Sequence, residues 1–175
     1  MTDSPYVSRM FTFDGRSVEP FRQIADELLR NPESIDQMLA LAHTSHETAV
    51  AIGTTWIVKD LLERGVEPPD DLAIAIIDLL GAVEAADARL HLLQILPFVS
   101  LTAEQAQRLE SLLLPTLEDR NTFVRAWGYN ALGLVASAEP SLRKAVLERL
   151  EQASQSEKAS VRVRIRKARQ RLLDG

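Results

Sequence analysis

Two apolar stripes joined by a short polar turn lie in and around residues 112–136, and no other feature constrains the fold of this chain as strongly. A wheel of about 100° per residue places four residues within about 80° of Val124, namely Gly128, Ala131, Leu132 and Val135. The upstream stripe consists of leucines at helical spacing, Leu109, Leu112, Leu113 and Leu117. Neither helix can bury its stripe alone, so the pattern predicts two helices packed antiparallel.

Turn and cap signals separate the two helices. We expect the first helix to end at Glu118 and Asp119, after Pro115 has bent or weakened its last turns. Asn121 and Thr122 are good N-cap residues, so the second helix should begin near Asn121.

Helical spacing of apolar residues continues over most of the chain. Apolar residues make up 46% of the sequence and aromatic residues only 5%, with Ala and Leu dominant, which favours helices over strands. We therefore expect an all-α fold in which residues 17–175 form a single domain. Residues 1–16 should be an irregular N-terminal arm that packs Phe11 and Phe13 over the first helices, with a disordered tail as the alternative.

The last segment of the chain allows two predictions. Residues 161–166 alternate as a strand would, but Val161, Ile165, Ala168 and Leu172 fall within about 40° of one another on a helical wheel, so we expect a helix. Its basic residues then form two flanks, one with Arg162, Arg166 and Arg169 and the other with Arg164, Lys167 and Arg171.

Two Thr-x-x-Glu/Gln sequences resemble capping boxes at helix starts. They are Thr44 to Glu47 and Thr102 to Gln105. The helix that follows the first of them should end at Gly65, a favoured C-cap residue. His43, His46 and Glu47 also invite a metal-site interpretation, but the spacing differs from H-E-x-x-H and a capping box explains Glu47. We expect no metal site and no cofactor.

Composition excludes several classes of function. The chain has no cysteine, so it has no disulfide, thiolate nucleophile or Cys-type zinc site. It also lacks a Gly-rich phosphate loop and a G-x-S-x-G motif, so we expect no catalytic residues and no enzyme activity. Residues 1–16 show no signal-peptide pattern, and the apolar run at residues 72–83 is too short to span a bilayer, so we expect a cytoplasmic protein without membrane contact.

The second helices of successive pairs can be laid over one another. Arg125 follows Arg89 by 36 residues and precedes Arg162 by 37, and Val50 stands 39 residues before Arg89. A period of this length built from two helices is the signature of an α-solenoid.

The sequence here resembles the HEAT-repeat family, whose repeats carry an Asp in the turn of the pair and a Val-Arg early in the second helix. Asp119 and the pair Val124 and Arg125 match that pattern best. The resemblance implies a right-handed α-solenoid of about four to five antiparallel helix pairs. It also implies a ladder of hydrogen bonds between the Asp and Arg of neighbouring repeats, although Val83 and Ser156 replace the Asp before Arg89 and Arg162.

Second helices usually line the concave face of HEAT-like solenoids, so their polar and aromatic residues are candidates for binding. These are Trp56, Lys59, Asp60, Arg89, Arg125, Trp127 and Tyr129. A groove with aromatics and mixed charge would suit a partner peptide or helix. The alternative is that the tryptophans pack at the edge of the core and the charges form a solvated face.

The chain is therefore expected to be a non-enzymatic protein-interaction module that binds a protein partner on its concave face. The alternative is a nucleic-acid-binding or DNA-repair solenoid, because Trp56 and Asp60 resemble the aromatic-plus-Asp pair of HEAT-like alkylpurine DNA glycosylases. The basic C-terminal helix is either a docking site for phosphate or an acidic partner, or a solvated surface. The net charge of −5 argues against a whole-surface nucleic-acid binder. A third possibility, an enzyme accessory resembling the HEAT-like bilin lyases, rests on the fold alone.

Overall fold

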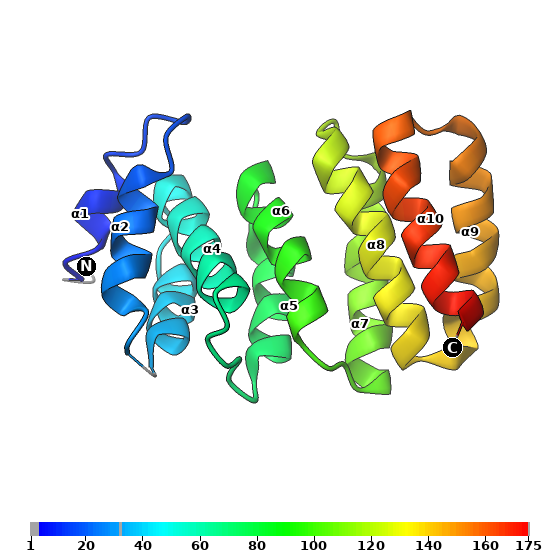
Figure 1. Ribbon diagram of the computed structural model, residues 1–175, viewed down its shortest axis with the longest axis horizontal. Helices are drawn as coiled ribbons and strands as arrows, with labels where there is room; N and C mark the ends of the chain where they lie inside the picture. Colours follow the sequence, from blue (N-terminus) through cyan, green and yellow to red (C-terminus); the bar gives the residue numbers. More distant parts are fainter. Residues whose placement is uncertain (1–3, 32, 175) are drawn as a thin grey trace. The chain divides into compact units, whose positions relative to one another are not determined.

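A computed structural model describes residues 4–31 and 33–174, and every regular element in these ranges is helical (Figure 1). The expected all-α fold is therefore confirmed. Contacts divide the chain into two compact units, residues 1–98 and residues 99–175. This division does not test the single domain expected over residues 17–175, which stays a prediction.

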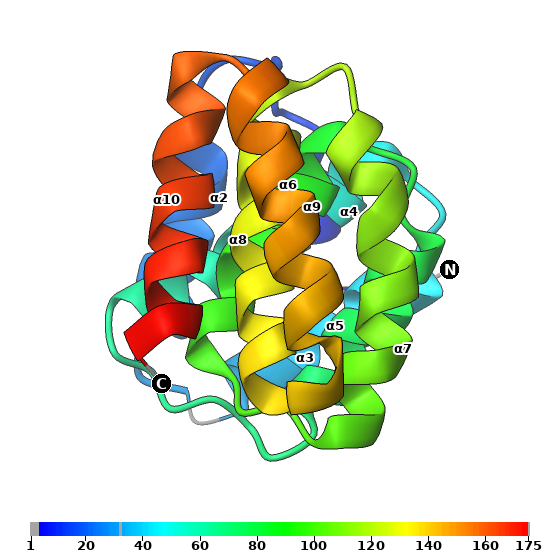
Figure 2. The same cartoon turned by 90° about the vertical axis from the view of Figure 1, so that its right-hand side faces the viewer.

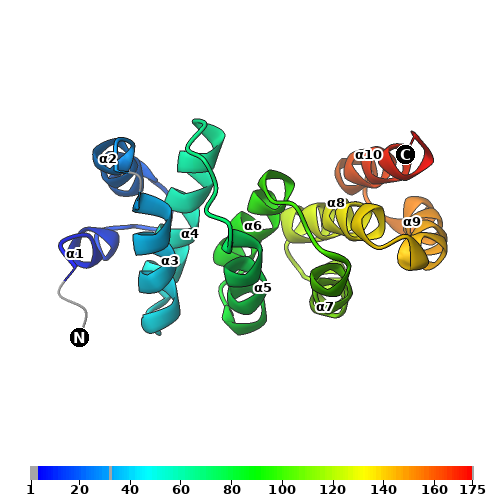
Figure 3. The ribbon, with the colours of Figure 1, turned by 90° about the horizontal axis from the view of Figure 1, so that it is seen from below.

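Helix α4 is the centre of the first unit. The unit consists of α1 (Val7–Met10), α2 (Glu19–Leu28), α3 (Ser34–Thr44), α4 (Thr48–Glu63), α5 (Leu72–Ala82), α6 (Ala86–Ile95) and the 3₁₀ turn η1 (Leu96–Phe98). Helix α4 packs against α2, α3 and α6, and Figure 3 shows α2, α4 and α6 in one layer with α3 and α5 in the other. This position buries α4 on most sides, including Val50, Ile57 and Leu61.

The N-terminal arm is more ordered than the sequence predicted. Beyond residues 1–3, which lie outside the described ranges, it contains the helical turn α1, whose Met10 is fully buried. The Phe13 ring packs on Phe21 of α2 with 4.7 Å between ring centroids, as expected, whereas Phe11 is exposed and does not pack as predicted. A Cβ atom at Gly53 of α4 would lie 2.9 Å from side-chain atoms of Met10 and Phe21. The glycine therefore allows the arm and α2 to pack closely against α4.

The two ends of α4 gave one wrong and one correct prediction. Thr44 does not open this helix with a capping box, because it is the last residue of α3 and its hydroxyl donates to the Ala40 carbonyl at 2.9 Å. An N-cap residue immediately precedes the first helical residue, and that position before α4 belongs to Glu47, not to Thr44. Helix α4 begins instead after Glu47, which makes no side-chain cap hydrogen bond. At the other end, Gly65 follows the helix with a φ of +86°, as a C-terminal glycine should.

Helix α8 is the centre of the second unit. The unit consists of α7 (Ala103–Leu113), η2 (Leu114–Glu118), α8 (Thr122–Ala138), η3 (Pro140–Leu142), α9 (Arg143–Ser156) and α10 (Ala159–Asp174). Helix α8 packs against α7, α9 and α10, which Figure 2 shows together. The capping box from Thr102 to Gln105 is confirmed at the start of α7. The Asn121 side chain accepts from the Phe123 N–H at 2.9 Å, which confirms the predicted start of α8. Pro115 lies where α7 gives way to the tighter turns of η2.

Helices α8 and α10 approach each other closely at Gly133. A Cβ atom at this position would lie 2.8 Å from Ala168 Cβ and 3.0 Å from Ala168 Cα, so the two backbones could not come so near with a larger residue. The helical prediction for the last segment is confirmed, because Val161, Ile165 and Leu172 are buried beside Ala168. This contact fixes which basic residues of α10 face α8.

Candidate interaction surfaces

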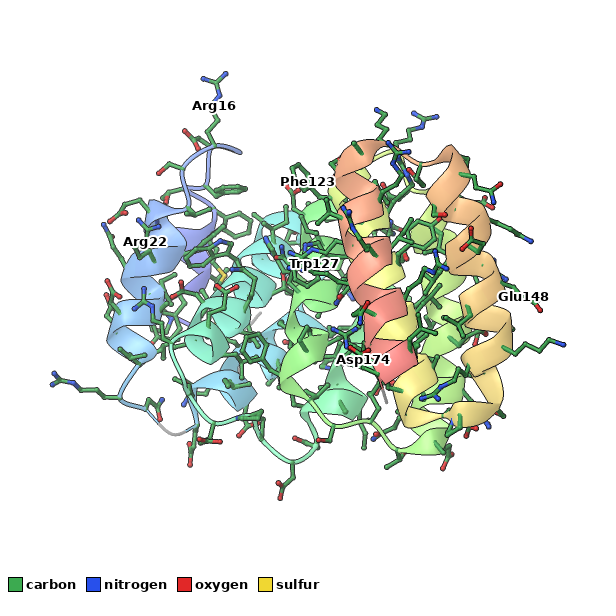
Figure 4. All side chains as sticks on the ribbon, turned by 45° about the vertical axis from the view of Figure 1, so that its right-hand side comes forward. Arg16, Arg22, Phe123, Trp127, Glu148 and Asp174 are labelled. Atoms are coloured by element: carbon green, nitrogen blue, oxygen red, sulfur yellow. The ribbon has the colours of Figure 1, made fainter. Side chains whose placement is uncertain are left out.

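An exposed aromatic side chain and a cation lie together on α8 and α10. The Arg164 guanidinium carbon lies 3.8 Å from the centroid of the Trp127 ring, within the range of a cation–π contact. Phe123 stands one turn before Trp127 on α8 and is 67% exposed. Figure 4 shows Phe123 and Trp127 on the same side of α10. We call Phe123, Trp127 and Arg164 the aromatic–cation surface.

Arg125 joins two turns of the second unit. Its Nε and Nη2 atoms donate to the Glu157 carboxylate at 2.8 and 3.1 Å, and Nη1 donates to the Asp119 carbonyl at 2.8 Å. The hydrogen bond to Glu157 raises the pKa of Arg125 above its ordinary value. Since both partners are mostly covered, this pair stabilises the connection between the start of α8 and the turn before α10.

Arg89 of the first unit makes the same kind of bond to the backbone. Its Nη2 atom donates to the carbonyls of Val83 and Glu84, six and five residues earlier, at 3.3 and 3.5 Å. Arg125 reaches carbonyls at the same two offsets, those of Asp119 and Arg120. A backbone carbonyl is available whatever the side chain, so this bond to Arg89 does not need an Asp at position 83.

Tyr129 does not join the other aromatic residues of α8. It is 7% exposed and lines a groove of about 750 Å³ together with residues of α7, η2 and α9, among them Leu117 and Arg149. Burial raises the pKa of the Tyr129 hydroxyl. Residues two apart on a helix point in roughly opposite directions, so Trp127 and Tyr129 lie on different sides of α8. Arg125 lies four residues before Tyr129 and so shares its side of α8, and a role of Arg125, Trp127 and Tyr129 in binding stays a prediction.

The candidate residues of α4 are largely covered. Trp56 is 9% exposed, and its ring centroid lies 6.1 Å from that of Phe21, so it packs at the edge of the core. Lys59 lies 5.8 Å above the Trp56 ring and pairs with Glu63 at 2.7 Å. Arg64 Nε lies 2.8 Å from Asp60 Oδ2, an ion pair in which this oxygen receives no hydrogen bond. Burial raises the pKa of Asp60, and the charge of Arg64 opposes that shift.

His91 of α6 is a buried titratable group beside α4. Its Nδ1 atom lies 3.1 Å from the Thr55 hydroxyl oxygen. Burial lowers the pKa of His91 from 6.5 to about 4, and the positive charge of Lys59 acts in the same direction. The imidazole is therefore neutral at pH 7 and holds α6 against α4.

The basic residues of α10 fall on two flanks, as the helical wheel predicted. On one flank, Arg162, Arg166 and Arg169 line a hollow of about 360 Å³ beside α9. On the other, Arg164 covers Trp127, and Arg171 donates to the Asn130 carbonyl at 3.4 Å. Burial lowers the pKa of Arg171. Lys167 on this second flank is exposed. The two flanks thus offer different chemistry.

The residues described give no sign of a metal centre. Across residues 4–31 and 33–174, no group of three or more His, Asp or Glu side chains is placed to hold a metal ion. His43 lies in the last turn of α3, whereas His46 follows that helix. Over the same ranges, no helix has both the length and the apolar character needed to cross a bilayer.

Comparison with protein-family models, with curated proteins and with solved structures found no match for this chain.

Sequence reasoning missed two residues that matter for these surfaces. Phe123 falls outside the apolar stripe of α8 yet lies one turn from Trp127, so the helical wheel contained the signal for an exposed aromatic pair. Glu157, the carboxylate partner of Arg125, gave no such signal, because it lies 32 residues away in the chain.

Proposed function

We propose that this chain is a non-enzymatic interaction module that binds an acidic segment of a protein partner through the aromatic–cation surface. The observation that carries the proposal is the exposure of Phe123 one turn from Trp127, with Arg164 over the Trp127 ring. Tryptophan and arginine are the residue types most enriched among those that dominate binding energy at protein interfaces.

The charge around this surface favours an acidic partner. Arg164, Lys167 and Arg171 share one flank of α10, next to the aromatic pair of α8. A negatively charged segment would gain from these cations, while an apolar side chain of the partner would cover Phe123. Covering a large exposed apolar side chain lowers the free energy of the complex, because its surface is removed from water.

We further propose that both units belong to one right-handed HEAT-like solenoid, as the sequence resemblance implies. Support comes from Arg89 and Arg125, which bond carbonyls at the same two offsets in different units. Further support is the packing of second helices within each unit, α4 with α2 and α6, and α8 with α10. The count of about four to five antiparallel pairs is part of this proposal.

The experiment is a quantitative capture of partners from lysate of the source organism, followed by binding measurements with the purified partner. Wild-type protein is compared with Phe123→Ala and Arg164→Ala, which we expect to fold because Phe123 is exposed and Arg164 is only partly covered. The expected result is a partner with an acidic binding segment whose affinity falls at least about tenfold in each variant.

A matched control is Ile74→Ala, which truncates another exposed apolar side chain in the first unit. It should leave the affinity for the partner unchanged. If Phe123→Ala and Arg164→Ala bind the partner as tightly as wild type, the aromatic–cation surface is not the binding site and the proposal fails.

The second candidate function is nucleic-acid binding, favoured by the row of Arg162, Arg166 and Arg169 on one flank of α10. The repair-like form of this idea needs an open Trp56 and a free Asp60, whereas Trp56 is packed on Phe21 and Asp60 is paired with Arg64. Binding of a DNA duplex that weakens steeply with salt would favour this candidate. The repair-like form would be supported if the wild-type protein excises an alkylated base from DNA and Asp60→Asn does not.

A further inference from the structure

The hollow beside α9 has a charged rim and an apolar floor. Arg162, Arg166 and Arg169 line it from α10, and Ile165 and Ala159 contribute the apolar part. Arg162 and Arg166 are exposed, while Ile165 is buried at its base. The spacing of the three arginines places them on one side of the helix over two turns.

Only one of these arginines has a carboxylate partner. Arg169 pairs with Glu151 of α9 at 2.6 Å. Among residues 4–31 and 33–174, neither Arg162 nor Arg166 has an acidic side chain within ion-pair distance. The hollow therefore keeps two guanidinium groups whose donors face a space large enough for a small anion.

We propose that this hollow binds a phosphate monoester group, carried by a phosphorylated serine or threonine of a partner protein. A phosphorylated side chain has a charge of about −1.5 to −2 at pH 7, which matches the two free guanidinium groups. Their planar donor geometry suits bidentate bonds to phosphate oxygens. Ala159 is the first residue of α10, so the positive end of the helix dipole adds to the attraction.

A nucleic-acid backbone fits the hollow less well. It carries one charge per phosphate along an extended strand, so its affinity depends on how many phosphates are neutralised by cations. Here Glu151 neutralises the third arginine, and the chain has a net charge of −5. The site is independent of the aromatic–cation surface, because it lies on the flank of α10 opposite Arg164.

The test uses a short alanine peptide with one phosphothreonine, titrated into the full chain at low salt. Binding is followed by calorimetry and by the NMR signals of the arginine Nε–H groups. We expect saturable shifts of Arg162 and Arg166, no binding of the unphosphorylated peptide, and weaker binding of inorganic phosphate, which has no peptide chain to contact the surface around the hollow. The double variant Arg162→Gln, Arg166→Gln should bind the phosphopeptide at least about tenfold more weakly.

Arg164→Gln is the matched control, since it removes one charge from the opposite flank of the same helix. Its affinity for the phosphopeptide should stay within about twofold of wild type, because screened charges at a distance contribute little. Lack of saturable shifts would overturn the proposal. So would equal shifts on both flanks, inorganic phosphate bound as tightly as the peptide, or a DNA duplex bound more tightly. Phe123→Ala should leave phosphopeptide binding unchanged, so this site and the aromatic–cation surface can fail separately.

Discussion

Helices α4 and α8 each carry one of the two tryptophans of the chain, and each tryptophan lies beside a cation. In α4, Trp56 packs on Phe21 and its cation is Lys59 of the same helix. In α8, Trp127 stays partly exposed and its cation is Arg164 of the neighbouring helix α10. The same residue type therefore has a core role in the first unit and a surface position in the second.

The difference between the two tryptophans comes from what packs beside them. Phe21 of α2 packs on Trp56, and Phe13 of the arm packs on Phe21 in turn. Beside α8 stands the polar helix α10, which presents a guanidinium group to Trp127. A tryptophan on a second helix is thus not by itself a sign of a binding face.

The largest effect should come from truncating the core tryptophan, Trp56, and the surface tryptophan, Trp127, provides the comparison. Trp56→Ala should lower the free energy of unfolding by about 3–5 kcal/mol, because it leaves a cavity at the edge of the core. Trp127→Ala should cost only about 1–2 kcal/mol, the loss of a partly exposed ring and its cation–π contact. Urea denaturation followed by circular dichroism measures both values. Equal losses would contradict the distinction between a core and a surface tryptophan.

The first unit should lose stability in mild acid. All three histidines lie in this unit, and the pKa of buried His91 falls from 6.5 to about 4 in the fold. The unfolded state then binds the proton first as the pH falls below about 6.5. The contribution of neutral His91 to the free energy of unfolding is therefore fully present above about pH 6.5. It is lost as the pH falls towards 4, and the whole loss is on the order of 3 kcal/mol.

Hydrogen exchange at pH 7 and pH 5 checks this pH dependence helix by helix. Protection should fall in α4 and α6 and stay nearly constant in α8 and α10. His91→Gln keeps a polar group near Thr55 but does not titrate, so it should remove most of this change. An unchanged pH profile in that variant would show that another group is responsible.

A smaller effect is expected at the close contact of α8 and α10. Gly133→Ala should destabilise the second unit by about 1–3 kcal/mol, because its new methyl group meets the backbone of Ala168. Ala168→Gly in the same chain should recover part of that loss, a coupling that thermal unfolding of the two single variants and the double variant measures. If the loss in the double variant equals the sum of the losses in the two single variants, the two residues are not coupled and the close contact does not limit the packing of α8 and α10.

The smallest effect should come from the ion pair of Arg125. Glu157→Gln keeps the shape of the side chain but removes its charge, so the charge-assisted bonds to Arg125 become ordinary ones. We expect a loss of about 1 kcal/mol in the free energy of unfolding. High salt should reduce the difference between variant and wild type only slightly, because the pair is mostly covered. A loss that disappears in salt would place the pair at the surface.

The sequence by itself determined the helices and most of their ends. Apolar spacing is local, so it identified α8 and α10 and chose helix over strand for residues 161–172. Cap and turn chemistry is also local, and it located Asn121, Gly65 and the box from Thr102 to Gln105. It failed at Thr44, where the hydroxyl bonds its own helix instead of the next one.

Only the tertiary structure decided which side chains remain available to a partner. Trp56 and Tyr129 are covered by neighbouring helices, whereas Phe123 is exposed. The sequence predicted these helices but could not show where they pack. The bond from Arg125 to Glu157 joins residues far apart in the chain, and no local pattern specifies such a pair. Helix formation depends on neighbours within a few residues, but exposure depends on packing between elements, and that packing separates the core tryptophan from the surface one.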